Sequence, residues 1–132
     1  MTPEQLIDFI KTFYHHFESG NGEAAAAMLA ENIVWENPMP EAIPFGRRSE
    51  GREGVVRYWG ELLETLDMGP MEVEQMIAQD DTVVVTGREA STVKATGKSY
   101  DMQWVHLFKV ADGKIYYGRE YNNTAEMLKA FL

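Results

Sequence analysis

The feature that most constrains this chain is a pair of long runs near its end, both rich in aromatic and β-branched residues. These runs cover residues 99–110 and 114–122, and the short link between them contains Asp112-Gly113. A glycine-containing link between two such runs predicts an antiparallel β-hairpin. Because alternate residues of a strand point to opposite faces, one face combines large apolar side chains with a few polar ones, as in a small-molecule pocket. The polar residues on that face are His106, Glu120 and Asn122.

The size and composition indicate one globular domain that spans residues 1–132. No run of eighteen apolar residues is present, so no membrane-spanning helix is expected. The first residues lack the basic and apolar regions of a signal peptide. Cysteine is absent, which excludes disulfides and thiolate metal sites. A cytoplasmic location is therefore the default expectation.

The charge of the chain bears on its partners. A formal net charge of −9 predicts repulsion from phosphate backbones, so nucleic acid is not an expected partner. The one basic cluster, Arg47, Arg48 and Arg52, alternates with Glu50 and Glu53. Charges interleaved in this way indicate a solvated loop in preference to an anion-binding site.

Hydrophobic periodicity predicts helices in the first half of the chain and strands in the second. Gly69-Pro70 is expected to end the third helix, and residues 37–50, with three prolines, are expected to form an ordered covering loop. The expected helices cover residues 3–18, 23–30, 52–66 and 124–132, and the expected strands cover 33–36, 71–78, 82–94, 99–110 and 114–122. The apolar stripe expected on the third helix is Val55, Val56, Trp59, Leu62, Leu63 and Leu66.

This order of elements predicts an α+β fold. Strands of about thirteen residues usually have to coil, so we expect a strongly curved, mostly antiparallel sheet. Three helices from the first half of the chain would close this sheet into a cone, and a ligand would lie inside the cone.

The register of the hairpin decides which side chains meet. We pair Val110 with Lys114 across a three-residue loop. This places His106 opposite Gly118, whose missing side chain leaves a void beside the imidazole, and places Glu120 diagonally from His106. The same register sets Phe108 opposite Tyr116, Trp104 opposite Glu120 and Met102 opposite Asn122.

His106 and Glu120 are the candidate catalytic residues. A carboxylate beside an imidazole orients the ring and raises its pKa, whereas burial lowers that pKa, and the sequence leaves the balance open. The competing interpretation is a histidine satisfied within an ordinary core, with the glutamate facing solvent at the sheet edge.

Other residues are candidates for the wall of a ligand pocket. Tyr14 would point its hydroxyl inward, or else bond a backbone carbonyl as a core residue. Asn37 would bind a substrate oxygen, or else cap the turn before Pro38. The aromatic candidates, each of which is also a plausible core residue, are Trp35, Trp59, Trp104 and Phe108, with Tyr58 beside Trp59. Asn122 would lie in the wall at the opening of the pocket.

No metal or cofactor site is predicted. His15 and His16 are neighbours on a helix and point about 100° apart, with no ligand four residues away to join either of them. No nucleophile elbow and no glycine-rich phosphate loop is present, because residues 46–51 are highly charged and follow no strand.

Five stretches of the chain form one pattern: residues 33–38, 51–55, 104–108, 112–115 and 119–125. Together they resemble the SnoaL-like polyketide cyclase and ketosteroid isomerase-like group of the NTF2-like superfamily. The resemblance implies an NTF2-like (cystatin-like) cone with a deep apolar pocket, often dimeric through the sheet. Relatives include steroid isomerases, limonene-epoxide hydrolases, dehydratases, polyketide cyclases and proteins that only bind ligands, so the fold leaves the function open.

The chain departs from the family pattern at its acids. By the resemblance, the catalytic Asp of steroid isomerases falls at Asn37, their oxyanion Tyr near Phe13, and their second acid near His106. SnoaL-like cyclases usually carry an Asp after Tyr121, where this chain has Asn123. An amide cannot act as a general base, so His106 would move the proton.

The leading hypothesis is therefore a cofactor-independent isomerase or cyclase. It would bind a small apolar or aromatic oxygenated substrate, and His106, alone or together with Glu120, would move a proton next to a carbonyl. The alternative is a non-catalytic protein that binds small hydrophobic ligands in the same pocket, which Asn123 favours. A homodimer through the sheet is also expected, because Gln103, Val105 and Leu107 suit an isologous contact.

Overall fold

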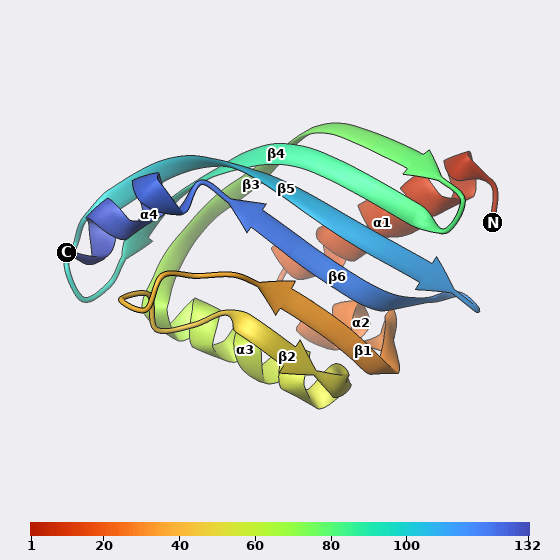
Figure 1. Ribbon diagram of the computed structural model, residues 1–132, viewed down its shortest axis with the longest axis horizontal. Helices are drawn as coiled ribbons and strands as arrows, with labels where there is room; N and C mark the ends of the chain where they lie inside the picture. Colours follow the sequence, from red (N-terminus) through yellow and green to blue (C-terminus); the bar gives the residue numbers. More distant parts are fainter.

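The computed structural model describes the whole chain, residues 1–132, as four helices and six strands (Figure 1). The helices are α1 (Pro3–Glu18), α2 (Gly22–Ala27), α3 (Gly51–Thr65) and α4 (Thr124–Phe131). The strands are β1 (Leu29–Asn37), β2 (Arg47–Glu50), β3 (Leu66–Gln79), β4 (Thr82–Val93), β5 (Ser99–Ala111) and β6 (Lys114–Asn122). No helix is both long enough and apolar enough to cross a membrane.

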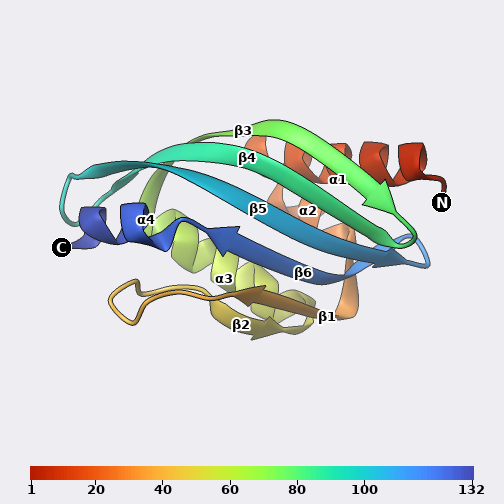
Figure 2. The same ribbon diagram turned by 45° about the horizontal axis from the view of Figure 1, so that its top comes forward.

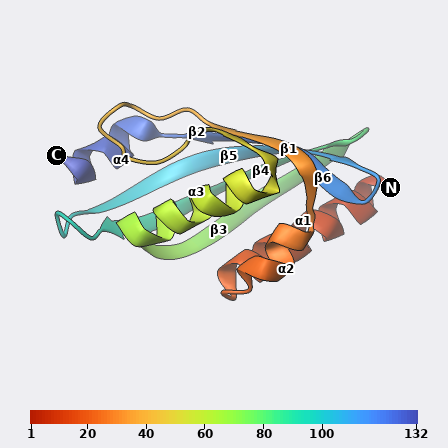
Figure 3. The same ribbon diagram turned by 90° about the horizontal axis from the view of Figure 1, so that it is seen from below.

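The strands form one six-stranded sheet in the order β2-β1-β6-β5-β4-β3. All neighbours are antiparallel except β1 and β6, which run parallel. Helices α1, α2 and α3 lie on one face of this sheet (Figure 3). Helix α4, at the C-terminus, lies at one end of the sheet (Figure 2). The predicted α+β class and mostly antiparallel sheet are confirmed, whereas the strong curling that we expected is not found.

Helix α1 begins as its sequence predicts. The Thr2 side chain accepts a hydrogen bond from the backbone N–H of Gln5, and the Gln5 side chain accepts one from the backbone N–H of Thr2. This capping box satisfies two amides that the first turn of a helix leaves free. The helix buries one face, formed by Leu6, Ile10, Phe13 and Tyr14, against the sheet.

Helix α3 differs from its prediction in the face that it buries. Tyr58 is buried, whereas Val56 and Leu63 are 43% and 50% exposed. Three-four spacing from Val55 leads to Tyr58 and Trp59, so the true stripe is rotated away from the more hydrophobic residues. The chain then enters β3 directly, and Gly69-Pro70 lies inside that strand as part of a register shift.

The β5–β6 hairpin has a different register from the predicted one. Its loop is two residues long, and Asp112 and Gly113 both have positive φ, as a type I′ turn requires. A bulge between Lys109 and Val110 adds a further shift. The total displacement is two residues, so every side chain keeps its predicted face but meets a different partner. The observed pairs are His106 with Glu120, Phe108 with Gly118 and Trp104 with Asn122.

The space above Gly118 is filled and is not a void beside His106. A Cβ atom at Gly118 would lie 2.3 Å from the indole of Trp35. The missing side chain therefore admits Trp35 against the sheet. The predicted cavity beside the imidazole must be bounded by other residues.

Residues 37–50, predicted as a loop, end in strand β2, which pairs with β1. Arg47 and Arg48 of the basic cluster are therefore exposed, as predicted, but they lie on a strand and not in a loop. Arg52 donates two hydrogen bonds to the backbone carbonyl of Leu29, at 3.1 and 2.7 Å, which ties the start of α3 to the start of β1.

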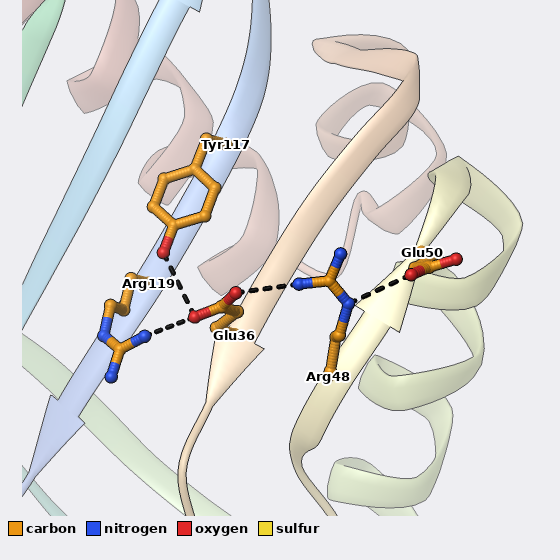
Figure 4. A network of polar contacts seen from close by, with 5 residues as sticks. All are labelled: Glu36, Arg48, Glu50, Tyr117 and Arg119. Atoms are coloured by element: carbon orange, nitrogen blue, oxygen red, sulfur yellow. Dashed lines mark hydrogen bonds and ion pairs between the residues drawn. The ribbon is translucent and has the colours of Figure 1, made fainter.

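A polar network joins β2, β1 and β6 on the face of the sheet opposite the helices (Figure 4). Glu36 accepts hydrogen bonds from Arg48 at 2.8 Å and from Tyr117 at 3.2 Å, and it also pairs with Arg119. Arg48 makes a second ion pair, 3.0 Å long, with Glu50. Because Arg48 and Glu50 are largely exposed, their pair adds little stability, and the network chiefly aligns the strands.

Candidate functional site

A cavity lies between the inner face of the sheet and helices α1 and α3. The space between the wall atoms, including the opening, is about 580 Å³. The centre of a water molecule can occupy only about 50 Å³ of this space. The cavity is therefore narrow, and a ligand larger than a few waters would displace wall side chains. Five of these are methionines, whose flexible side chains adapt readily: Met39, Met68, Met71, Met102 and Met127.

His106 lines this cavity from β5 and is 6% exposed. Its Nδ1 lies 2.6 Å from the hydroxyl oxygen of Tyr14, and its ring stacks on Trp104 with centroids 4.0 Å apart. Burial lowers the pKa of His106 to about 3, so the imidazole is neutral at physiological pH. Of the two opposing effects weighed from the sequence, desolvation dominates.

The hydroxyl of Tyr14 determines the tautomer of His106. Burial raises the pKa of Tyr14, so its hydroxyl stays protonated, and we assign it as the donor of the hydrogen bond to Nδ1. A neutral imidazole that accepts at Nδ1 carries its own hydrogen on Nε2. The ring therefore presents an N–H donor on the side away from Tyr14.

Glu120 lies directly across from His106 on β6 and is anchored through one oxygen. Its Oε2 accepts hydrogen bonds from the indole N–H of Trp35 at 2.9 Å and from the hydroxyl of Tyr58 at 2.7 Å. Its Oε1 lies 3.7 Å from Nε2 of His106, which is too long for a hydrogen bond. Because the imidazole is neutral, this contact is not an ion pair.

The environment of Glu120 favours the protonated form. Burial raises the pKa of its carboxyl, and the polar side chains of Tyr58, Trp35 and Asn122 offset part of that rise. A carboxylate with a raised pKa is a stronger base than one in water. Oε1 is the oxygen left available for such a role.

An amide chain extends from Glu120 along the cavity wall. The side-chain NH₂ of Asn37 donates to the hydroxyl oxygen of Tyr58 at 2.7 Å, and the NH₂ of Asn122 donates to Oδ1 of Asn37 at 3.0 Å. Asn37 thus faces the cavity and does not cap the turn before Pro38. The chain ends at Oδ1 of Asn122, which is buried and has no partner.

The structure brings together most of the residues predicted for the site. Tyr14, Trp35, Asn37, Trp59, Phe108 and Asn122 all line the cavity with His106 and Glu120. Trp104 does not. It lies behind the imidazole and is 2% exposed, and a Cβ at Gly87 would come within 2.5 Å of its ring. Trp104 supports His106 by stacking on the far side of the imidazole ring. The absence of a side chain at Gly87 leaves room for the indole.

Asn123 lies outside the cavity, so it does not bear on the chemistry as the sequence suggested. It is exposed at the start of α4, and its side chain makes no capping hydrogen bond. The presence of an amide at this position therefore removes no acid from the cavity and no longer favours the binding protein.

A second buried carboxyl group, that of Glu89 on β4, is not among the residues predicted for the site. Glu89 lines the cavity and is 6% exposed. Tyr100 and Ser91 both donate to its Oε2, at 2.7 and 2.9 Å. The signal in the sequence is the inward alternation from Val83 to Val93, in which Glu89 occupies a position that should be apolar.

The family model for the SnoaL-like domain matches residues 10–118, and the chain belongs to this family. Its structure is similar to an NTF2-like protein from Burkholderia xenovorans LB400, with 24% identity, a TM-score of 0.89, and 100% of this chain and 99% of that chain covered. A candidate isomerase from Bacillus subtilis is 22% identical, with a TM-score of 0.82 and coverage of 97% and 93%.

A candidate SnoaL-like polyketide cyclase from Mesorhizobium loti is 26% identical to the chain, with a TM-score of 0.74, and the match covers 92% of this chain and 99% of that one. No curated protein sequence matches the chain. These likenesses establish the NTF2-like fold, and they include proteins described as isomerases and cyclases without assigning a particular activity to this chain.

Proposed function

We propose that the protein is a cofactor-independent acid–base enzyme that isomerises or cyclises a small apolar or aromatic oxygenated substrate in this cavity. The observation that carries the proposal is the pairing of two groups across β5 and β6. Glu120 is held by two donors on Oε2, and its free Oε1 lies 3.7 Å from Nε2 of a neutral His106. A base and a hydrogen-bond donor therefore stand side by side in a largely apolar enclosure.

The geometry divides the chemistry between these two residues. Oε1 of Glu120 would remove a proton from the carbon next to a substrate carbonyl, and the electron pair of that C–H bond would move onto the carbonyl oxygen. The Nε2–H of His106 would donate a hydrogen bond to this oxygen and stabilise the enolate. Glu120, and not His106 as the sequence suggested, is thus the proton acceptor.

Two outcomes follow from the same enolate. Return of the proton from Glu120 to a different carbon gives an isomer of the substrate. Attack of the enolate carbon on a second carbonyl of the same molecule closes a ring, and the oxygen of that carbonyl takes the proton held by Glu120. The descriptions of the structural relatives as candidate isomerases and a candidate cyclase support this class of reaction.

Exchange of α-protons tests the proposal without knowledge of the product. A panel of enolisable ketones and lactones is incubated with the protein in D₂O, and loss of the α-proton signal is followed by NMR. We expect the wild type to accelerate exchange for at least one member, and Glu120→Gln to lower the rate by about 10²–10⁴-fold. His106→Ala should lower it by about 10²-fold or more.

The matched control is Glu64→Gln, on the exposed face of α3, which should exchange at the wild-type rate. Equal rates in the wild type and Glu120→Gln would contradict the proposed base. Equal rates in the wild type and His106→Ala would exclude the proposed donor.

The alternative is a protein that binds small hydrophobic ligands without transforming them. The five methionines of the wall favour it, because flexible thioether side chains are typical of sites that accept varied ligands. Tight binding of panel members with no exchange in the wild type would identify this function in place of the enzymatic one.

A further inference from the structure

Glu89 is a buried carboxyl group for which the reaction proposed above has no use. Both of its protein donors, Tyr100 and Ser91, contact the same oxygen, Oε2. No protein group donates to Oε1, although Glu89 lines the cavity and is only 6% exposed. Oε1 is not one of the enclosed side-chain atoms that lack a partner, so it is open to the cavity, where a ligand that carries a donor can reach it.

The backbone around Glu89 is shaped to hold it in this position. Strand β3 shifts register between Met68 and Met71, opposite Ser91 and Glu89. Gly69 approaches so closely that a Cβ atom there would lie 1.9 Å from the carbonyl oxygen of Ala90. This approach brings the N–H of Gly69 within 3.1 Å of Ser91 Oγ. The Ser91 oxygen then accepts from Gly69, and its hydroxyl hydrogen is left to donate to Glu89.

Glu89 and Glu120 form two polar ends of one cavity. Glu89 pairs with Met102 on one side of β5, and Glu120 pairs with His106 on the other side. Met102 and His106 are four residues apart, so the two carboxyl-bearing residues are offset by about 13 Å along the strand. The space between these ends is lined chiefly by aromatic and methionine side chains.

The charges around the cavity select the kind of ligand. Glu89 and Glu120 are acidic, His106 is neutral, and neither lysine nor arginine lines the wall. A ligand carboxylate would meet two acidic groups and no counter-ion, whereas a ligand ammonium or hydroxyl would supply the hydrogen that Oε1 of Glu89 lacks.

We propose that Glu89 is a second binding residue of this cavity, and that it takes a hydroxyl group or a protonated amine at the end of the ligand remote from the reacting carbonyl. The inference deepens the proposed function and rests on it in placing the carbonyl beside His106 and Glu120. The substrate class is thereby an elongated, largely apolar carbonyl compound with a hydrogen-bond donor at its far end, and carboxylic acids are excluded.

Binding of four ketones with one skeleton tests the assignment. They are 4-phenylbutan-2-one and its para-hydroxyl, para-aminomethyl and para-carboxyl derivatives, and calorimetric titration at neutral pH gives the Kd of each. We expect the hydroxyl and aminomethyl compounds to bind about tenfold or more tightly than the parent ketone, and the carboxyl compound about tenfold or more weakly.

Variants of the Glu89 cluster identify the residue responsible. Glu89→Gln should abolish the preference for the aminomethyl compound and reduce the penalty on the carboxyl compound. Tyr100→Phe leaves the carboxyl in place with one donor fewer, should weaken the same preference, and provides the test if Glu89→Gln does not fold. Glu72→Gln, an exposed position on β3, is the matched control and should bind all four compounds like the wild type.

Several results would overturn the assignment. They are equal binding of all four ketones, tightest binding of the carboxyl compound, no binding of any of the four, or unchanged preferences in the folded cluster variants. The preference pattern without any α-proton exchange would uphold Glu89 and remove the proposed enzymatic function. If the parent ketone exchanges its α-protons but all four compounds bind equally, the enzymatic function would stand and the role of Glu89 would be wrong.

Discussion

The hydroxyl oxygen of Tyr14 lies 2.6 Å from Nδ1 of His106, and the two rings are stacked nearly parallel at 12°. The residues are 92 positions apart in the sequence and come from α1 and β5. Their contact is buried, so this hydrogen bond links α1 to the sheet at the site, as the one from Tyr58 to Glu120 links α3 to it. Through this bond Tyr14 sets which nitrogen of His106 faces Glu120.

Removing that hydroxyl should weaken both stability and exchange. Tyr14→Phe leaves a buried Nδ1 without a donor, which lowers the free energy of unfolding by about 1–3 kcal/mol. It also frees the imidazole to carry its hydrogen on Nδ1, so we expect α-proton exchange to fall by about tenfold or more. Urea unfolding and NMR measure the two effects. Tyr121→Phe, at a half-exposed position on the opposite face, should change neither, and equal losses in both variants would contradict the role of Tyr14.

Burial of His106 predicts a particular loss of stability in acid. Its pKa is about 3 in the folded protein against 6.5 for the free side chain. Below pH 6.5 the unfolded chain takes up a proton that the folded chain does not, so this residue lowers stability by roughly 2 kcal/mol between pH 6.5 and 4.5. Glu89 and Glu120 act in the opposite direction, because their pKa values are raised and the folded state protonates first.

The comparison with a variant isolates the contribution of His106. His106→Gln, which still offers Tyr14 an acceptor, should lose less stability than the wild type between pH 6.5 and 4.5, as measured by urea unfolding at several pH values. The exposed residue His15 provides the control, and His15→Gln should follow the wild-type curve. Parallel curves for the wild type and His106→Gln would show that the imidazole is not buried as described.

Trp35 should lower the pKa of the proposed base, Glu120. Its indole donates to Oε2 of Glu120 and so stabilises the ionised carboxylate. Trp35→Phe removes this donor, which raises the pKa of Glu120 further and moves the acidic limb of the pH–rate profile for exchange to higher pH. Trp59→Phe changes another tryptophan of the same cavity that has no bond to Glu120, and it should leave the limb in place. A purely structural role for Trp35 would lower the rate without moving the limb.

The glycine beneath Trp35 gives a sharper test of packing. A Cβ at Gly118 would lie 2.3 Å from the indole, so Gly118→Ala forces the ring away from the sheet. We expect a loss of about 1–3 kcal/mol in unfolding free energy, together with a change in tryptophan fluorescence. At Gly60, in the middle of α3, an added Cβ meets no atom within 4 Å. Gly60→Ala should therefore raise stability by about 0.5–1 kcal/mol, and a loss in both variants would refute this account.

The sequence predicts the helices and strands of this fold better than it predicts which residues of neighbouring strands pair. Periodic apolar residues indicate α1, β5 and β6 because burial of one face imposes that period. The hairpin register could not be predicted, because it depends on a bulge at Lys109 and Val110 and on the left-handed conformation of Asp112. Even so, a displacement of two residues preserves the faces, and this is why His106 and Glu120 still meet.

The site shows the same division between local and tertiary information. A histidine on an apolar strand stands out in the sequence, and so does a glutamate among aromatic residues. Glu89 is marked only by its inward position in an alternating strand. Its burial is made tolerable by Tyr100 on β5 and by Ser91, whose hydroxyl is oriented by an irregularity of β3. Such support is assembled by strand pairing and leaves little trace in a single strand.

The face of the sheet opposite the helices carries an apolar patch, and we expect it to form an isologous contact between two copies of the chain. The register aligns its members in neighbouring rows, and Ile77 and Tyr121 are 54% and 49% exposed. The members of the patch are Ile77, Val84, Val105, Leu107 and Tyr121.

A charge at the centre of this patch tests the homodimer. Leu107→Glu would place two carboxylates at the middle of an isologous interface, where both are desolvated, so we expect the variant to be monomeric at concentrations at which the wild type is dimeric. Sedimentation velocity measures the difference. Glu61→Lys, on the exposed side of α3, should leave the wild-type dimer intact. A wild type that remains monomeric at every concentration would refute the interface, whereas dimers in both variants would place the contact elsewhere on the surface.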